Sequence, residues 1–310
     1  MSGRLIGALV ALCAVAAAPF DPVRAETVSV TTTAAADGAA MFVAQEEGIY
    51  AKHGLVVKPT LTAIMPNIPP AVVSNSVQVG LVTTTTFLQA VDGGVDLVAL
   101  VGGSIVSHKL DNMGVLARQG STIRTAQDLV GKRVGVPGLG AFLHVMFRYW
   151  LSVKGVDPAK VNYVEVTFPT MRDILAGGTV DAVLAIDPVK SLILDTKTGY
   201  LVSPLIPDLP DGESEILYIA TRGWVEGHPK EVAAFRAAIT EAEAIVNRDP
   251  QKALADFGKY VKMPAPVLKL TKIGIQRPEL TRAQLDWWVG IMKQQGLVRG
   301  DFDTGRLIVK

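Results

Sequence analysis

Short runs of apolar and β-branched residues alternate with helical stretches along most of this 310-residue chain. In its first part the expected strands are Val28–Thr33, Leu55–Leu61, Val77–Val82 and Leu97–Val101. The expected helices of this part are Gly38–Glu47 and Thr84–Val91. Strands that alternate with helices predict an α/β fold in which helices cover both faces of a sheet.

A second α/β unit is expected to begin near Met113. Its expected strands are Met113–Ala117, Lys132–Val136, Val161–Val166 and Ala182–Ala185. Its expected helices are Ser121–Leu129, Ala141–Lys154 and Thr170–Ala176. After one more strand, Ile216–Thr221, the chain is expected to be wholly helical, with helices at Pro229–Asn247, Pro250–Tyr260, Pro264–Thr271 and Thr281–Gln295.

This order of elements predicts two lobes joined by two strand-like crossings, near residues 110–116 and 214–222. Lobe I comprises residues 26–112 and 217–310, with the C-terminal helices, and lobe II comprises residues 113–216. Ligands of open α/β sheets bind at the carboxyl ends of the strands. We therefore expect a cleft between the lobes that closes on a small molecule by a hinge movement.

The first 25 residues have the layout of a secretory signal peptide. Arg4 is followed by a 14-residue apolar run over residues 5–18, by two prolines, and by Val23-Arg24-Ala25, a small-residue cleavage site. The run is too short for a comfortable membrane span. We expect cleavage near Ala25 and a periplasmic mature protein of about 285 residues. Such a location argues against enzymes that depend on ATP or reduced nicotinamide.

Cysteine content and charge exclude further classes. The only cysteine is Cys13, inside the predicted signal peptide, so the mature chain has no disulfide, zinc-thiolate site or thiolate nucleophile. Without Arg4, Asp21 and Arg24, the 30 basic and 29 acidic residues become 28 of each, and the mature chain is neutral. A neutral chain has no electrostatic footprint for nucleic acid. We expect no cofactor and no metal.

Four segments, in this order and spacing, carry a resemblance to a known family. They are Ala40–Leu55, Val77–Gly80 with Gly93–Asp96 after it, Asp128–Pro137, and Leu175–Ala182 with Asp187-Pro188 after it. Together they resemble the periplasmic solute-binding proteins of ABC importers, in the nitrate, sulfonate, taurine and thiamine-precursor group. The resemblance implies a type II binding protein, two α/β lobes with a cleft, that delivers a solute to a membrane permease driven by a cytoplasmic ATPase. We expect it to act as a monomer.

The ligand loops of that family follow the strands. Mapped onto this chain they are Ala35–Gly38, Thr83–Phe87, Ser104–His108, Pro137–Phe142, Phe168–Arg172 and Ile186–Pro188. The candidate ligand-binding residues in these loops are Asp37, Thr83, Thr84, Thr85, Ser104, His108, Gly138, Gly140, Phe142, Phe168, Arg172 and Asp187.

Two of the loops are candidate anion sites. Thr83, Thr84 and Thr85 lie where a strand passes into a helix, so their hydroxyls and the unpaired N–H groups of the first helical turn can receive a carboxylate or sulfonate. The alternative is that one threonine caps the helix and the others pack. Gly138 and Gly140 open the next long helix and let backbone N–H groups approach a ligand, unless they form only a tight turn.

The two aspartates favour a different ligand. In a cleft, Asp37 or Asp187 prefers an amine or another hydrogen-bond donor. Their structural alternatives are an N-cap for Asp37 and a turn start for Asp187.

The remaining candidates also have two interpretations. Arg172 can pair with a carboxylate or lie on a solvated helix face. His108 is a possible ligand contact or a structural histidine. Phe142 and Phe168 can form the wall of an aromatic ligand site or belong to the core.

The function expected from these residues is reversible binding of a small organic solute, an organic anion such as a sulfonate or carboxylate. The alternative ligand is a pyrimidine, thiamine precursor or other heterocycle. An enzyme on the same fold is a further alternative, although the pyrimidine synthases that resemble this family need a cysteine-rich segment that the mature chain lacks. The last alternative is a sensor protein that binds the solute without taking part in transport.

Overall fold

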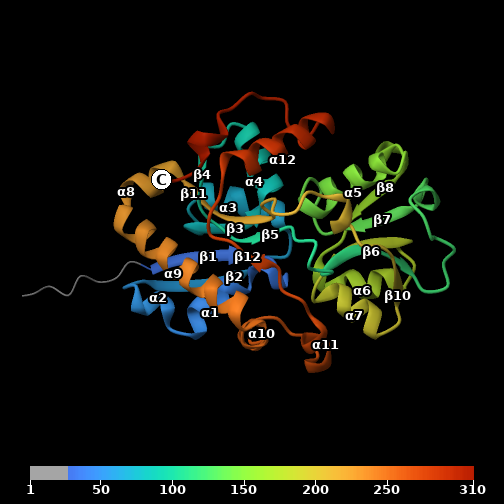
Figure 1. Ribbon diagram of the computed structural model, residues 1–310, viewed down its shortest axis with the longest axis horizontal. Coiled ribbons are helices and arrows are strands. Elements are labelled where there is room, and N and C mark those ends of the chain that lie inside the picture. Colours follow the sequence, from blue (N-terminus) through green and yellow to red (C-terminus); the bar gives the residue numbers. More distant parts are fainter. Residues whose placement is uncertain (1–26) are drawn as a thin grey trace, which may run out of the picture.

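The computed structural model describes residues 27–310, which form two α/β units side by side (Figure 1). The predicted signal peptide therefore lies outside the described residues. The first unit contains a five-stranded sheet with the strand order β2-β1-β3-β11-β4. Its strands are β1 (Thr27–Thr32), β2 (Val56–Leu61), β3 (Val79–Thr83), β4 (Leu97–Gly102) and β11 (Ile216–Thr221).

The second unit contains another five-stranded sheet, with the order β10-β6-β9-β7-β8. Its strands are β6 (Met113–Arg118), β7 (Arg133–Val136), β8 (Asn162–Glu165), β9 (Ala182–Ile186) and β10 (Gly199–Ser203). Each sheet contains one strand that the chain enters from the other unit. This strand is antiparallel to both of its neighbours. β6 pairs with β9 and β10 in this way, and β11 with β3 and β4. The predicted two-lobed α/β fold is confirmed, and the exact lobe boundaries stay predictions.

The two crossings lie against each other. The Val106 N–H donates to the Glu213 carbonyl at 2.8 Å, and the Glu215 N–H donates to the Ser104 carbonyl at 3.0 Å. Short strand β5 (Ser104–Ile105) also pairs with β12 (Ile275–Gln276). The crossings thus form a hydrogen-bonded ribbon that joins the two lobes.

Helices cover both sheets, as the alternation predicted. Lobe I carries α1 (Ala39–Glu46), α2 (Ile49–Lys52), α3 (Ile68–Val73) and α4 (Thr84–Asp92). Lobe II carries α5 (Phe142–Val153), α6 (Phe168–Ala176) and α7 (Val189–Asp195). The C-terminal part adds α8 (Arg222–Gly227), α9 (Pro229–Arg248), α10 (Pro250–Phe257), α11 (Ala265–Leu270) and α12 (Arg282–Gln294).

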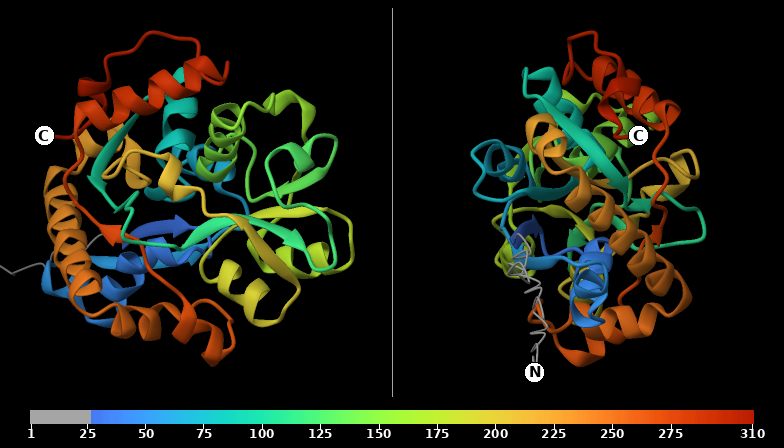
Figure 2. Two further views of the ribbon diagram at one scale, coloured as in Figure 1. Left: turned by 45° about the vertical axis from the view of Figure 1, so that its right-hand side comes forward. Right: turned by 90° about the vertical axis from the view of Figure 1, so that its left-hand side faces the viewer.

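The C-terminal helices contact both lobes (Figures 1 and 2). α9 and α10 pack on α1 of lobe I, whereas α11 contacts α7 of lobe II. α12 packs on α4, and α4 in turn packs on α5. The rings of Phe142 on α5 and Trp288 on α12 meet edge to face with centroids 5.4 Å apart, so the lobes share a buried apolar contact on this side. Within residues 27–310 no helix is both apolar and long enough to traverse a lipid bilayer.

Some helices and strands of the structure differ from those expected from the sequence. The helix predicted at Ser121–Leu129 is reduced to a single 3-10 turn, Gln127–Leu129, and the C-terminal part includes the short strand β12 as well as helices. Helix α3 was not predicted. Pro69 and Pro70 lie in its first turn, where the missing N–H removes no intrahelical hydrogen bond.

Candidate functional site

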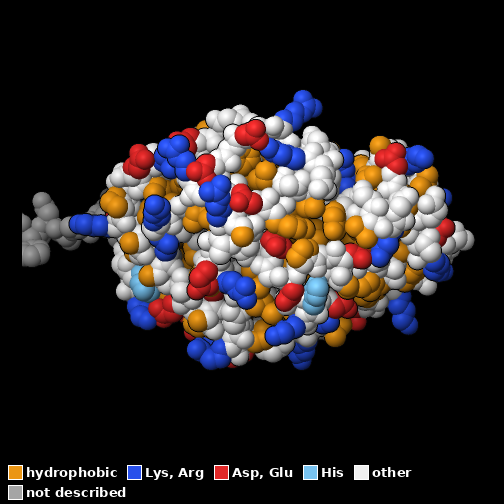
Figure 3. Space-filling view, turned by 45° about the horizontal axis from the view of Figure 1, so that its top comes forward, with side chains coloured by type: hydrophobic (Ala, Val, Ile, Leu, Met, Phe, Trp, Pro, Cys, Tyr) orange, Lys and Arg blue, Asp and Glu red, His pale blue; other side chains and the backbone are white. Residues whose placement is uncertain are grey.

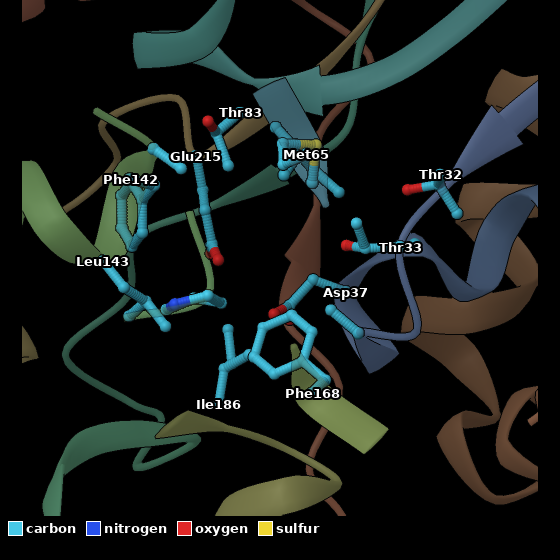
Figure 4. Close-up of a pocket in the computed structure, with 15 residues that line it drawn as sticks. Thr32, Thr33, Asp37, Met65, Thr83, Phe142, Leu143, Phe168, Ile186 and Glu215 are labelled. Carbon is cyan, nitrogen blue, oxygen red and sulfur yellow. The ribbon is translucent and has the colours of Figure 1, made fainter. Parts of the chain in front are cut away.

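A pocket lies between the lobes, where the strand ends of both sheets meet (Figure 4). Lobe I contributes the carboxyl ends of β1 and β3, with Thr32, Thr33 and Thr83, and lobe II contributes Ile186 at the end of β9. Because β11 is antiparallel to its neighbours, its first end reaches the same edge and brings Glu215 into the pocket. The cavity has a volume of about 40 Å³.

Asp37 is the first of two carboxyl groups in the pocket. It belongs to a short 3-10 turn, Ala36–Gly38, and is almost completely buried. The Gly274 N–H donates to its Oδ1 at 2.5 Å, and the Asn112 amide donates to the same oxygen at 3.2 Å. Burial raises the pKa of Asp37 to about 7, and the charge of Asp187 adds to this effect, while the hydrogen bonds oppose it.

Glu215 carries the second carboxyl group in the pocket. It is also buried, and the Ser104 hydroxyl donates to its Oε2 at 3.2 Å. Burial raises the pKa of Glu215 well above its usual range, and the charge of nearby Asp37 raises it further. Because the two carboxyls interact through their side chains, they titrate as a pair. The hydrogen bond between the two side chains lowers the pKa of Asp37 and raises that of Glu215, so Asp37 is the group of the pair that ionises more readily.

The other groups around the cavity are hydroxyls and apolar side chains. Figure 4 shows Asp37 and Glu215 pointing into a space enclosed by Met65, Phe142, Leu143, Phe168 and Ile186. Among the described residues that line this pocket, none is lysine, arginine or histidine. The Thr33 hydroxyl is buried and makes no hydrogen bond with any described residue, so it is free to bind a ligand atom.

Of the sequence-predicted candidates, Asp37, Thr83, Phe142 and Phe168 line this pocket. Thr83 also caps α4, since its Oγ1 accepts the Thr86 N–H at 3.3 Å. Thr84 and Thr85 are fully buried outside the pocket lining. The Thr84 hydroxyl donates to the Ser214 carbonyl at 3.0 Å, and the Thr85 hydroxyl lies 3.2 Å from that of Thr83.

Gly138 and Gly140 lie beside the pocket and do not line it. Gly140 has a φ of +78°, and the amide of Gln89 from α4 donates to its carbonyl at 3.3 Å. The N–H of Gly140 donates to His144 Nδ1 at 2.9 Å, so this N–H is already paired. The two glycines let the loop turn closely between the lobes.

Three further candidates make structural contacts outside the pocket lining. Ser104 supports Glu215 as described above. His108 Nε2 lies 2.6 Å from the Leu209 carbonyl oxygen, within the crossing segments. Arg172 is on the exposed side of α6 and pairs with Asp173 at 2.6 Å.

Asp187 joins the lobes instead of lining the pocket. Its main-chain carbonyl accepts the Ala36 N–H of lobe I at 3.0 Å. Its carboxylate accepts the N–H groups of Ser191 and Lys272, each at 2.9 Å. Burial raises the pKa of this carboxyl, against the effect of these hydrogen bonds.

Sequence reasoning missed Glu215, Thr33 and Met65. The sequence offers a weak indication for Glu215, because an acidic residue directly before a buried strand lies at the end of that strand, where sites form. Nothing in the sequence indicates that Thr33 lacks a partner.

The chain matches the model of the NMT1/THI5-like family over residues 35–253. It belongs to this family. The match covers the pocket residues Asp37, Thr83, Phe142, Phe168 and Glu215.

Curated relatives of this family member include both binding proteins and biosynthetic proteins. It is 27% identical to a putative thiamine biosynthesis protein of Haemophilus influenzae, over 72% of this chain and 69% of the relative. It is 26% identical to the 4-amino-5-hydroxymethyl-2-methylpyrimidine phosphate synthase of Uromyces fabae, over 84% and 80%. It is 24% identical to the taurine-binding periplasmic protein of Escherichia coli, over 83% and 77%.

A solved structure shows the same fold at low sequence identity. The alkanesulfonate-binding protein SsuA of Xanthomonas axonopodis, bound to MOPS, superimposes with a TM-score of 0.79 and 16% identity. The superposition covers 91% of this chain and 98% of SsuA. The fold is therefore that of the periplasmic binding proteins.

Proposed function

We propose that this protein is the extracytoplasmic substrate-binding protein of an ABC importer and that its lobes close on a small organic solute. The fold, the family and the periplasmic taurine-binding relative support this function. Its partners are then a membrane permease and the ATPase that drives it. The observation that carries the proposal is the pocket itself, which both lobes line and in which two buried carboxyls face the cavity.

The proposed ligand class is a solute with an N–H donor, such as an ammonium, amino or ring N–H group. A buried carboxylate is stable only when it is paired or hydrogen-bonded. Asp37 accepts hydrogen bonds from the protein but has no basic partner among the described lining residues, so a cationic or N–H donor group of the solute complements its charge. A simple anion with no donor meets repulsion from Asp37 in a medium of low dielectric constant.

At the N-terminus of α4, where the sequence predicts an anion site, groups of the protein already make some of the hydrogen bonds. Thr83 caps this helix, and the Thr84 N–H donates to the Glu215 carbonyl at 2.9 Å. The N-terminus of α5 differs, because Ala141 offers no side-chain cap to the first N–H groups. Phe142 and Leu143 begin this helix and line the pocket, so an acceptor atom of the solute has a place there.

The names of two relatives fit such a solute. Taurine carries an amino group and a sulfonate, and 4-amino-5-hydroxymethyl-2-methylpyrimidine carries an amino group and ring nitrogens. The first combines a donor with an anion, and the second, which the name of the relative gives as its phosphate, combines a heterocycle with an anion. Both present the N–H donor that Asp37 and Glu215 complement.

A matched trio of small molecules tests the ligand class. Taurine has an amine and a sulfonate on two carbons, ethylamine has only the amine, and ethanesulfonate has only the sulfonate. We expect taurine and ethylamine to raise the melting temperature, since a ligand at one hundred times its Kd stabilises by about 2.7 kcal/mol. Ethanesulfonate is expected to have no effect, and Asp37→Asn should abolish the shift by ethylamine, whereas the exposed-site control Arg172→Ala should keep it.

Other outcomes separate the alternatives. Stabilisation by ethanesulfonate alone would reject the donor ligand and return the ligand class to a simple organic anion, with the importer function intact. The synthase relative keeps an enzyme as the second candidate. Mass spectrometry of every solute that stabilises the protein, before and after incubation, distinguishes the two, because a binding protein returns its solute chemically unchanged.

A further inference from the structure

A second hollow lies directly outside the pocket, and its walls are mostly apolar. Lobe I contributes Ala34, Leu61 and residues 260–263, and lobe II contributes Phe168, Pro169 and Val189. We call this hollow the outer groove. Its volume is about 230 Å³, against about 40 Å³ for the inner pocket.

Phe168 separates the two hollows. Its ring, at the start of α6, lines both the inner pocket and the outer groove. On the lobe I side the neighbours Ala35 and Ala34 line the inner and the outer hollow respectively. The outer groove therefore lies next to the proposed ligand pocket, with the Phe168 ring between them, and both lobes line it.

The groove presents apolar surface to solvent at its outer end. Leu61 is 39% exposed there, although it is a large aliphatic residue. Tyr260 turns its polar end away, since its hydroxyl donates to Glu46 at 2.6 Å and its ring packs on Phe42 with centroids 4.5 Å apart. An apolar hollow beside a polar pocket offers a place for an apolar part of the same solute.

The opposite side of the cleft is closed by contacts between the lobes. Gln89 of α4 bonds to the Gly140 carbonyl at 3.3 Å, and Arg148 of α5 bonds to the Gln295 carbonyl at 3.1 Å, next to α12. A solute that extends beyond the inner pocket on the Phe168 side meets the apolar walls of the outer groove.

We propose that the solute has two parts, a nitrogen-donor head held by Asp37 and Glu215 and an apolar tail that lies in the outer groove against Phe168 and Leu61. The inference rests on the proposed function. It adds that the protein selects amphiphilic solutes over small polar ones.

The n-alkylammonium ions from ethyl to octyl, measured by calorimetry, test this proposal. Once the chain reaches the groove, each added methylene should tighten binding about fourfold, the equivalent of about 0.8 kcal/mol. The variant Leu61→Asn should lose this gain and keep its affinity for ethylammonium. Val56→Asn is the matched control, because Val56 begins the same strand, β2, and is 51% exposed.

The outcomes distinguish this inference from the proposed function. Octylammonium that binds no tighter than ethylammonium, or an equal gain in Leu61→Asn, would overturn the two-part solute and leave the donor site intact. Binding by no alkylammonium ion would also overturn it. In that case stabilisation by taurine or ethanesulfonate still supports the importer function, and its absence with every solute of the earlier screen counts against that function too.

Discussion

The Ala36 N–H donates to the Asp187 carbonyl at 3.0 Å, and this hydrogen bond joins lobe I to lobe II directly behind the pocket. Its two ends are the neighbours of pocket residues, since Asp37 follows Ala36 and Ile186 precedes Asp187. The carboxylate of Asp187 adds a second tie, to the Lys272 N–H at 2.9 Å. Closure of the lobes and formation of the pocket therefore depend on the same few residues.

The Asp187→Ala variant should bind its solute less tightly. The Ser191 and Lys272 N–H groups lose their buried acceptor, at a cost of about 1–3 kcal/mol, and the tie to Lys272 is made between separate parts of the chain. We expect a Kd about tenfold weaker for the best solute of the screen, measured by calorimetry. Asp173→Ala is the control, because Asp173 is an exposed carboxylate of the same lobe. An unchanged Kd in Asp187→Ala would show that its carboxylate has no part in closure.

Binding of ethylammonium should strengthen as the pH rises through neutrality. The pKa of Asp37 is raised to about 7, chiefly by burial, so a proton must leave before its carboxylate can pair with a cation. An alkylammonium ion, like lysine, stays charged over this range. We expect the affinity to rise about tenfold between pH 6 and pH 8 in the wild type. In Asp37→Asn the pH dependence should be largely lost, and a curve of the same slope in both proteins would assign the titration to another group.

The fold could be predicted from the sequence because its elements have strong local signals. Helix α5 carries Leu143, Phe147 and Trp150 at helical spacing, and all three are buried. The strands β4 and β9 are buried throughout and read as continuous apolar runs. The exposed or short elements were harder, as α7 has seven residues and β10 is a half-buried edge strand.

The site could be predicted only in part, because its chemistry depends on pairing across the chain. Asp37 was a candidate because of its loop. Its partner Glu215 was not, because Glu215 comes beside Asp37 only when β11 inserts between β3 and β4. The threonines after β3 look alike in sequence. Their hydrogen bonds divide them, with Thr83 at the pocket and Thr84 held by Ser214.

The threonines give a further prediction. Thr84→Val removes a buried hydroxyl that donates to the Ser214 carbonyl at 3.0 Å and leaves that carbonyl with fewer donors. The free energy of unfolding should fall by about 1–3 kcal/mol, measured by urea unfolding. Because Thr84 does not line the pocket, the Kd for the solute should change less than twofold. A large loss of affinity in a folded Thr84→Val protein would mean that the solute reaches this hydroxyl.

The surface carries charges of both signs intermixed, with no large block of one sign on the face shown in Figure 3. How pH affects stability is better tested at a buried titratable group than at these exposed charges. Glu243 on α9 is fully buried, and its two carboxyl oxygens make no hydrogen bond with any described residue. Burial raises its pKa to about 9, and the charge of Glu279 adds to this effect.

Glu243→Gln should make the protein less sensitive to alkaline pH. Between the ordinary pKa of glutamate and about 9, the folded state keeps the Glu243 proton while the unfolded state has lost it. Folding then takes up a proton, so the free energy of unfolding falls as pH rises, by up to about 1.4 kcal/mol per pH unit for this group. Urea unfolding at pH 5 and pH 8 should show a smaller loss in Glu243→Gln than in the wild type. Glu226→Gln, at an exposed position of α8, is the control and should follow the wild type, and the same loss in all three proteins would remove Glu243 as the cause.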